Sequence, residues 1–194
     1  MPAALATIRT EPLDELTLRR AQRGDDRAWR ALVERYQAPV HALIWRLLAG
    51  RSRHRVEDLV QETFVRVLRA LPSWDLAGPA SLQTWILTIA TRLTLNELRK
   101  PEMTTIIGDP PATDSTDAAS ERARIAAAIA AGVATLPDAQ RAVFVLREYH
   151  ELEYADISEA LGLDLGTVKS RLARARQALR ERLVAELPEL WRRR

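Results

Sequence analysis

The sequence predicts an all-α fold of two small helical domains joined by a flexible acidic linker, the C-terminal domain being a helix-turn-helix. Apolar residues recur at helical spacing over residues 25–100 and again after residue 120. Between them, residues 101–120 carry four acidic and no basic residues, and Pro, Thr, Ser and Asp gather where helical periodicity fails. We expect domains at residues 1–100 and 121–194. The stretch between them is a solvated linker or an acidic strand that occupies a nucleic-acid channel in a partner.

The composition excludes several kinds of functional site. The chain has 194 residues, 47% of them hydrophobic, which is enough for a modest core in each domain. It contains no cysteine, so disulfides and thiolate metal sites are excluded. His41, His54 and His150 are far apart and have no strong ligand at helical spacing, and there is no Gly-rich phosphate loop. We expect no metal, no cofactor and no catalytic site.

The hydropathy pattern predicts a cytoplasmic protein. The first residues, MPAALATIRTEPLDEL, contain no apolar run of signal-peptide length. No later stretch approaches the ~18 uncharged apolar residues of a membrane span. We therefore expect no membrane insertion.

The first strong helical pattern starts after Gly24 and runs to Gly50. Asp25 is placed to cap it, because a carboxylate accepts from the free N–H groups of a first helical turn. Pro39 lies inside the pattern and predicts a kink. The apolar stripe comprises Trp29, Leu32, Val33, Tyr36, Val40, Leu43, Ile44 and Leu47.

A second helix, RVEDLVQETFVRVLRAL, has an unusual outward side. Its inward stripe comprises Val56, Leu59, Val60, Phe64, Val67 and Leu71. The outward side carries Asp58, Gln61, Glu62 and Arg69, with the apolar Val65 among them. An exposed apolar residue ringed by charge indicates either a protein interface or an ordinary solvated face.

A loop from Leu71 leads to a third helix, SLQTWILTIATRLTLNELRK, that carries threonines along one side. Thr84, Thr88 and Thr91 share this side, opposite an apolar stripe that includes Ile86 and Leu93. Their hydroxyls are available to a phosphate backbone, or they bond back to carbonyls of their own helix.

Two tryptophans border the same loop. Trp74 lies within it and Trp85 lies in the first turn of the following helix. Their rings either stack on nucleic-acid bases or pack into a small helical core.

The C-terminal domain contains a helix, a glycine turn and a basic helix. LEYADISEALG is the first helix, with Gly162 where a left-handed C-cap is needed. Asp164 is placed to cap the second helix, which buries the stripe Val168, Leu172, Ala175 and Leu179. Its outer face is small in the middle and basic at its edges, a pattern typical of a helix that lies on DNA. A helical hairpin with another role shares this pattern.

Three motifs in register resemble the two conserved regions of extracytoplasmic-function sigma factors. They are EDLVQETFVRVLRAL, TWILTIATRLTLNELRK and LPDAQRAVFVLREYHELEYADISEALGLDLGTVKSRLARAR, and the similarity covers about residues 25–100 and 120–183. The resemblance implies that the N-terminal domain docks on core RNA polymerase, and that its loop and third helix take the downstream promoter element. It implies that the C-terminal domain reads the upstream element, and that an anti-sigma factor is a further partner.

The resemblance assigns residues to each contact. Polymerase docking falls to Asp58, Gln61, Glu62 and Val65. The downstream element falls to Trp74, Ser81, Thr84, Trp85, Thr88, Thr91 and Arg92. The upstream element falls to Thr167, Lys169, Ser170, Arg171, Ala173, Arg174 and Arg176.

Two positions depart from the family pattern. Thr91 and Arg92 stand where members commonly have Arg followed by Asn. Ala173 lacks the larger side chain often found there, so recognition would lean on Ser170, Arg174 and the flanking basic residues. The alternatives are a helix-turn-helix regulator that does not join polymerase, and a helical adaptor that uses only the Asp58 face.

Overall fold

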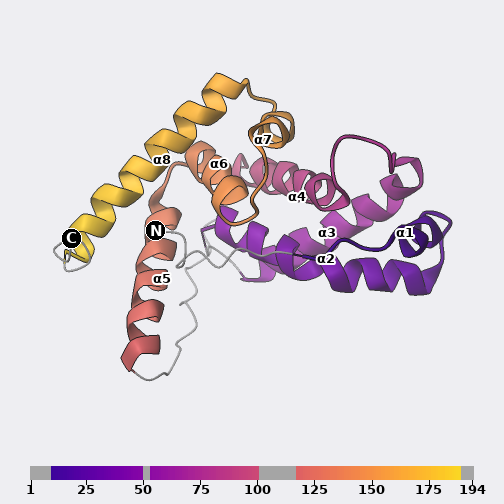
Figure 1. Ribbon diagram of the computed structural model, residues 1–194, viewed down its shortest axis with the longest axis horizontal. Helices are drawn as coiled ribbons and strands as arrows, with labels where there is room; N and C mark the ends of the chain where they lie inside the picture. The colour runs from indigo at the N-terminus through magenta and orange to yellow at the C-terminus, as the bar shows by residue number, and fades with distance from the viewer. Residues whose placement is uncertain (1–9, 50–52, 101–116, 189–194) are drawn as a thin grey trace.

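The computed structural model describes residues 10–49, 53–100 and 117–188, which form an all-helical protein without strands (Figure 1). This confirms the all-α prediction. Residues 101–116, most of the predicted linker, lie outside the described residues. None of the described helices is both long and apolar enough to cross a membrane.

The N-terminal half is a helical bundle arranged around one long central helix. Its elements are α1 (Glu15–Gln22), α2 (Asp26–Leu47), α3 (Arg53–Ala70), the 3₁₀ turn η1 (Leu71–Ser73) and α4 (Leu82–Leu98). Helix α2 packs against α1, α3 and α4, and α3 also packs against α4. Along α2, Leu32, Val40, Leu43, Ile44 and Leu47 are completely buried, as the apolar stripe predicts.

Helix α2 begins where the sequence predicts. The Asp25 carboxylate accepts from the backbone N–H groups of Arg27 and Ala28, both at 2.9 Å. The helix continues past Pro39, which is buried. Helix α1 was not predicted. Its Gln22 side chain donates to the carbonyls of Leu71 (3.0 Å) and Trp74 (2.8 Å), so α1 fixes the start of the loop that precedes α4.

The C-terminal half comprises α5 (Asp117–Thr135), α6 (Asp138–Glu148), α7 (Tyr154–Leu161) and α8 (Leu165–Glu186). Helix α5 begins inside the range predicted for the linker, so residues 117–120 are helical and the predicted boundary at residue 121 is four residues late. Helix α8 packs against α5, α6 and α7. The approach of α5 to α8 is close at Gly132, where a Cβ atom would lie 2.7 Å from Leu179 Cδ2.

The predicted helix-turn-helix is present at α7 and α8. Gly162 follows α7 with φ 63°, a left-handed conformation, and its N–H bonds back to carbonyls in the last turn. The Asp164 carboxylate caps α8 by accepting from the Thr167 N–H at 2.7 Å. Hydrogen bonds from the Thr167 hydroxyl and N–H lower the pKa of Asp164. Val168, Leu172, Ala175 and Leu179 are buried.

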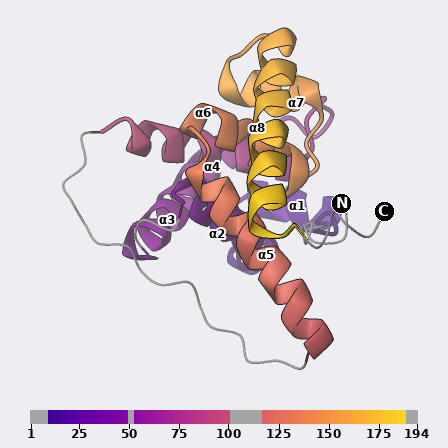
Figure 2. The ribbon, with the colours of Figure 1, turned by 90° about the vertical axis from the view of Figure 1, so that its left-hand side faces the viewer.

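The two halves pack against each other. Helix α7 lies on α4, and α5 and α6 lie on α2 (Figures 1 and 2). Buried residues from both halves therefore belong to one continuous hydrophobic cluster. We call the contact between the halves the interdomain junction: α2 and α4 on one side, α5, α6 and α7 on the other.

Candidate functional site

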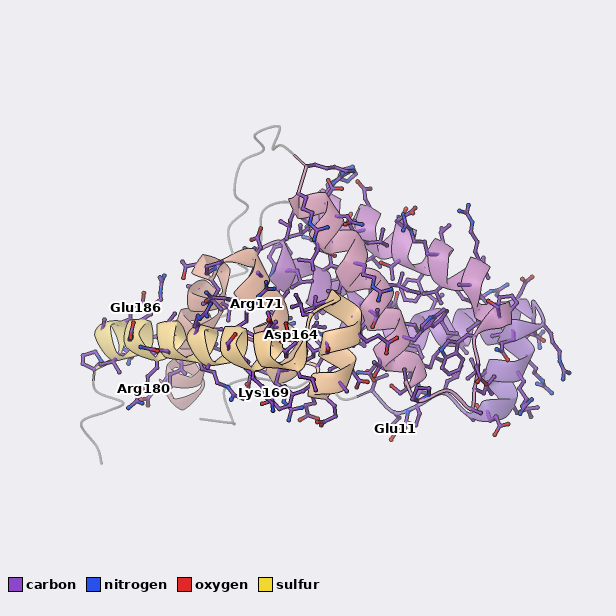
Figure 3. The ribbon with its side chains drawn as sticks, turned by 90° about the horizontal axis from the view of Figure 1, so that it is seen from above. Glu11, Asp164, Lys169, Arg171, Arg180 and Glu186 are labelled. Atoms are coloured by element: carbon purple, nitrogen blue, oxygen red, sulfur yellow. The ribbon has the colours of Figure 1, made fainter. Side chains whose placement is uncertain are left out.

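The exposed face of α8 carries the predicted upstream contacts. Lys169, Ala173 and Arg174 are exposed, and Ser170 and Arg171 are partly exposed. Figure 3 shows Lys169 and Arg180 on one side of α8 and Arg171 on the other. The face is therefore small along its centre and basic along both edges, a shape that fits a DNA groove between its phosphates.

Three of these side chains already have partners within the fold. Arg176 Nε donates to Glu148 Oε1 of α6 at 2.9 Å, so α6 holds the guanidinium in place. The Thr167 hydroxyl donates to Asp164 Oδ2 (2.6 Å), and the Ser170 hydroxyl donates to the Thr167 carbonyl (3.1 Å). These bonds fix the first turns of α8, which a recognition helix presents to base edges.

The loop before α4 holds the two tryptophans together. The rings of Trp74 and Trp85 lie 5.8 Å apart, centre to centre, and are tilted by 35°. Both are partly buried and pack against the core. Ser81 caps α4 by accepting from the Thr84 N–H at 3.1 Å, and the two hydroxyls lie 2.9 Å apart. Of the two readings for the tryptophans, the core contact is therefore present.

The threonines of α4 bond back to their own helix. Thr88 donates to the Thr84 carbonyl (2.9 Å) and Thr91 donates to the Leu87 carbonyl (2.7 Å). Thr84 and Thr88 are partly exposed, whereas Thr91 is completely buried. The expectation that all three share an exposed side is therefore wrong for Thr91. Helix α4 packs on both sides, against the N-terminal bundle and against α7, and this leaves little of its surface free.

The outward side of α3 presents the residues assigned to polymerase docking. Asp58, Gln61, Glu62 and Val65 are all exposed. Asp58 lies 3.8 Å from Arg55, and Glu62 accepts from Arg66 Nε at 2.8 Å, so local cations partly neutralise both acids. Leu68, which sequence reasoning missed, is 46% exposed and continues the side at i+3 from Val65. These five residues, the docking face, combine acid with apolar surface.

Arg92 lies at the interdomain junction. From α4 its Nη2 donates to the Glu159 carbonyl (2.9 Å) and its Nε donates to the Ala160 carbonyl (3.1 Å). Both carbonyls belong to the last turn of α7, where helical carbonyls lack intrahelical partners and the helix dipole is negative. Arg92 therefore caps a helix of the opposite half.

Arg141 makes the reciprocal contact and was missed by sequence reasoning. It is only 2% exposed, and its Nε donates to the carbonyl of Leu47, the last residue of α2, at 2.9 Å. The same guanidinium donates to the carbonyls of Ala134 and Leu136 and pairs with Asp138. An Arg directly before the apolar run AVFVL was the available signal, because a buried Arg needs partners for all its donors.

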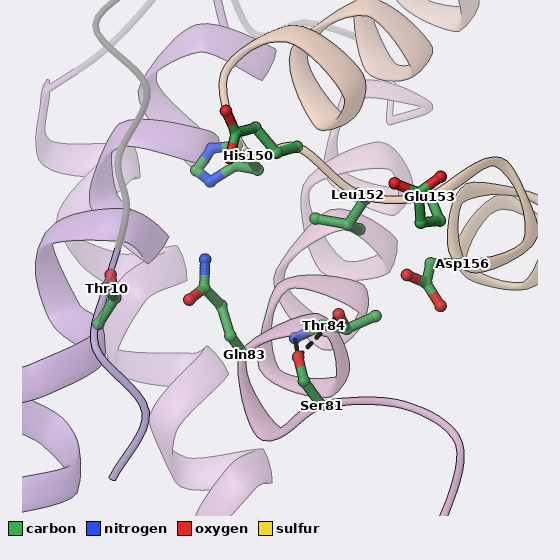
Figure 4. A pocket seen from close by; sticks show the side chains of 9 residues that line it. Thr10, Ser81, Gln83, Thr84, His150, Leu152, Glu153 and Asp156 are labelled. Carbon is green, nitrogen blue, oxygen red and sulfur yellow. Dashed lines mark hydrogen bonds between the residues drawn. The ribbon is translucent and has the colours of Figure 1, made fainter.

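A pocket of about 420 Å³ opens at the same junction (Figure 4). Ser81, Gln83 and Thr84 line one side, and residues 150–153 with Asp156 line the other. His150 is 5% exposed, and neither of its ring nitrogens has a hydrogen-bond partner among the described residues. Burial, with a smaller effect of Arg46, lowers the pKa of His150 to about 3, so the imidazole is neutral. Within the described part of the chain, no three His, Asp or Glu side chains are grouped to hold a metal ion.

Comparison with known proteins matches both halves. Sigma-70 region 2 matches residues 32–102, and Sigma-70 region 4 matches residues 126–179. The RNA polymerase sigma-H factor of Pseudomonas aeruginosa is 32% identical, over 93% of this chain and 98% of its own length. The ECF RNA polymerase sigma factor SigW of Bacillus subtilis is 30% identical, over 86% of this chain and 94% of its own length.

A solved structure has a similar fold. CnrH, in complex with the cytosolic domain of CnrY, aligns with a TM-score of 0.62 and 27% identity, over 89% of this chain and 97% of CnrH. Both the sequence and the fold comparisons therefore extend over nearly the whole chain.

Proposed function

This chain belongs to the sigma-70 family as an extracytoplasmic-function sigma factor, and we propose on that premise that it binds core RNA polymerase and directs it to specific promoters. One observation carries the proposal. The same chain exposes the docking face on α3 and a basic recognition helix at α8, so it has one surface for a protein and another for DNA. A regulator that does not join polymerase has no need of the first surface.

We assign a separate role to each surface. The docking face contacts core polymerase through its acids and through Val65 and Leu68. The loop with Trp74 and the start of α4 at Ser81 and Thr84 take the opened strand of the downstream element. The outer face of α8 reads the upstream element, with Arg174 near its centre and Lys169 and Arg176 at its edge.

We also propose an anti-sigma factor as a partner. The support is the family, together with the structure of CnrH, which was solved with the cytosolic domain of CnrY bound. Because core polymerase and the chromosome lie in the bacterial cytoplasm, we place the chain there. Its role is to position polymerase and promoter, and no catalytic step of its own is proposed.

Transcription in vitro tests this function directly. Purified chain and core polymerase are mixed with fragmented genomic DNA, and the 5′ ends of the transcripts are mapped. We expect new start sites that share an upstream and a downstream element and that need the added chain. If the chain binds duplex DNA specifically but neither binds core nor changes its start sites, it is instead a regulator that acts without polymerase.

A further inference from the structure

We propose that the free chain closes on itself, with α7 covering the face of α4 that is proposed to take DNA, and that Arg92 and Arg141 hold this closed state. The inference rests on the proposed function for the meaning of the covered face. The closure itself rests on contacts between the halves.

The reciprocal contacts of the two arginines make the closure specific. Arg92 reaches from the N-terminal half to the end of α7, and Arg141 reaches from the C-terminal half to the end of α2. Each guanidinium supplies hydrogen bonds and positive charge to carbonyls at the negative end of a helix dipole. Opening the junction leaves both helix ends and both arginines to water, and for the buried Arg141 it breaks a bond made out of contact with solvent.

The closed state excludes a nucleic-acid strand by shape and by charge. Ser81 and Thr84, at the start of α4, face residues 150–153 and Asp156 across the pocket. Carboxylates of Glu151, Glu153 and Asp156 therefore line the space opposite the residues assigned to the downstream element. Only part of this charge is compensated, by contacts such as Arg147 with Glu153 at 3.1 Å. A phosphodiester chain entering this space meets like charge and too little room.

The closed state is also poised to open. The junction buries the His150 imidazole with both nitrogens unpaired among the described residues, which opposes closure. A partner that separates α7 from α4 therefore relieves an unfavourable contact while it breaks favourable ones. We infer that binding to core polymerase, through the docking face on α3, favours the open state.

The distance between the halves tests the closure without DNA. Because the chain has no cysteine, Arg30→Cys on α2 and Ala178→Cys on α8 place two spin labels at exposed positions, one in each half. Electron paramagnetic resonance then gives their distance distribution in the full chain. We expect one narrow distribution for the free chain and a shift when core polymerase is added. Arg92→Ala should raise the ratio of open to closed chains on the order of tenfold, because it removes two charged hydrogen bonds.

Arg99→Ala is the matched control. Arg99 follows α4, is exposed, and donates to Asn96 of its own helix at 3.3 Å, so it removes the same charge without touching the junction. Its distance distribution should equal that of the parent. A broad distribution in the parent, or equal distributions in Arg92→Ala and the parent, overturns the proposal. Failure of the parent to bind core polymerase would instead contradict the proposed function and leave the distance result standing.

A second variant tests whether closure excludes DNA. Arg92 is itself assigned to the downstream element, so its strand affinity does not separate the two roles. Arg46 has no assigned DNA contact, and its guanidinium lies over Tyr149 across the junction. Arg46→Met should open the junction and raise the affinity of the free chain for a fluorescein-labelled non-template strand of a mapped promoter about threefold. Opening with no gain in strand affinity would refute the exclusion of DNA.

Discussion

The guanidinium of Arg46 on α2 lies over the ring of Tyr149 at the end of α6, with its central carbon 4.1 Å from the ring centre. The next residue, His150, is buried beside this contact, and its pKa is lowered to about 3, first by burial and then by Arg46. The carboxylates of Glu151, Glu153 and Asp156 line the same pocket. A buried neutral imidazole next to a cation makes the stability of the fold depend on pH.

We therefore expect stability to fall as the pH is lowered from 6.5 towards 3. Above pH 6.5 His150 is neutral in both states, so its contribution is fully present. Below that pH the unfolded chain takes up a proton that the folded chain does not bind until about pH 3. At pH 5 the loss from this residue is about 2 kcal/mol, from 1.36 kcal/mol per pKa unit. Urea unfolding between pH 7.5 and 5 measures it.

Two histidine variants identify the source of this acid sensitivity. His150→Leu should remove most of the loss, and because the imidazole nitrogens are unpaired in the described structure, it should not destabilise the fold at pH 7.5 by more than ~1 kcal/mol. His41, an exposed histidine on α2, is the control. His41→Gln should keep the acid sensitivity of the parent. Equal sensitivity in His150→Leu and the parent would show that other groups cause it.

Removing the acids of the docking face should weaken polymerase binding without harming the fold. Asp58 and Glu62 are exposed and pair only with neighbours on their own helix, so Asp58→Ala with Glu62→Ala should change stability by less than ~1 kcal/mol. We expect the affinity for core polymerase, measured by titration with labelled chain, to fall about tenfold or more. Glu34→Ala, an exposed acid on α2, should bind as the parent does. Unchanged affinity in the double variant would exclude this face.

Arg174 and Arg180 should differ in the kind of DNA contact they make. Arg174 lies near the middle of the outer face of α8, so Arg174→Ala should lose about 1–3 kcal/mol at one base position and relax the preference there. Arg180 lies on the flank, so Arg180→Ala should weaken all promoters alike and reduce the salt dependence. Transcription from single-base variants of the upstream element, at two salt concentrations, separates the two effects. A uniform loss in Arg174→Ala would mean that this residue does not read sequence.

The turn between α7 and α8 should require glycine for its backbone and not for space. Gly162 has φ 63°, and no heavy atom lies within 4 Å of a Cβ built on it. Gly162→Ala should therefore destabilise the fold by about 1 kcal/mol, and Gly162→Asn by less, because Asn tolerates the left-handed region. Denaturant unfolding measures both. Equal stability of the alanine variant and the parent would contradict a strained turn.

Residues that obey a local rule were predictable from the sequence. The caps at Asp25 and Asp164, the glycine at Gly162 and the buried stripe of α8 follow from hydrogen bonding and periodicity within one helix. The exposed acids and Val65 on α3 follow from the same periodicity. The family motifs then assign these surfaces to partners.

Contacts between distant segments were not predictable in this way. Nothing local to Arg92 indicates that it donates to carbonyls 67 and 68 residues away, since every residue carries a carbonyl. Thr91 was expected to be exposed because one side of α4 is polar, yet α4 packs on two sides and buries it. Helix α1 and the early start of α5 were missed because both sequences are weakly apolar or lie in a Thr- and Ser-rich region.

The choice of acceptors at the junction affects how this protein can evolve. Arg92 and Arg141 bind across the junction to main-chain oxygens at the ends of α7 and α2, and substitution of a side chain leaves those oxygens in place. The surfaces of α7 and α8 can therefore drift towards new DNA sequences without losing the groups that the arginines bind. A lineage that duplicates this gene can diversify its promoters while each copy inherits the same interdomain contact.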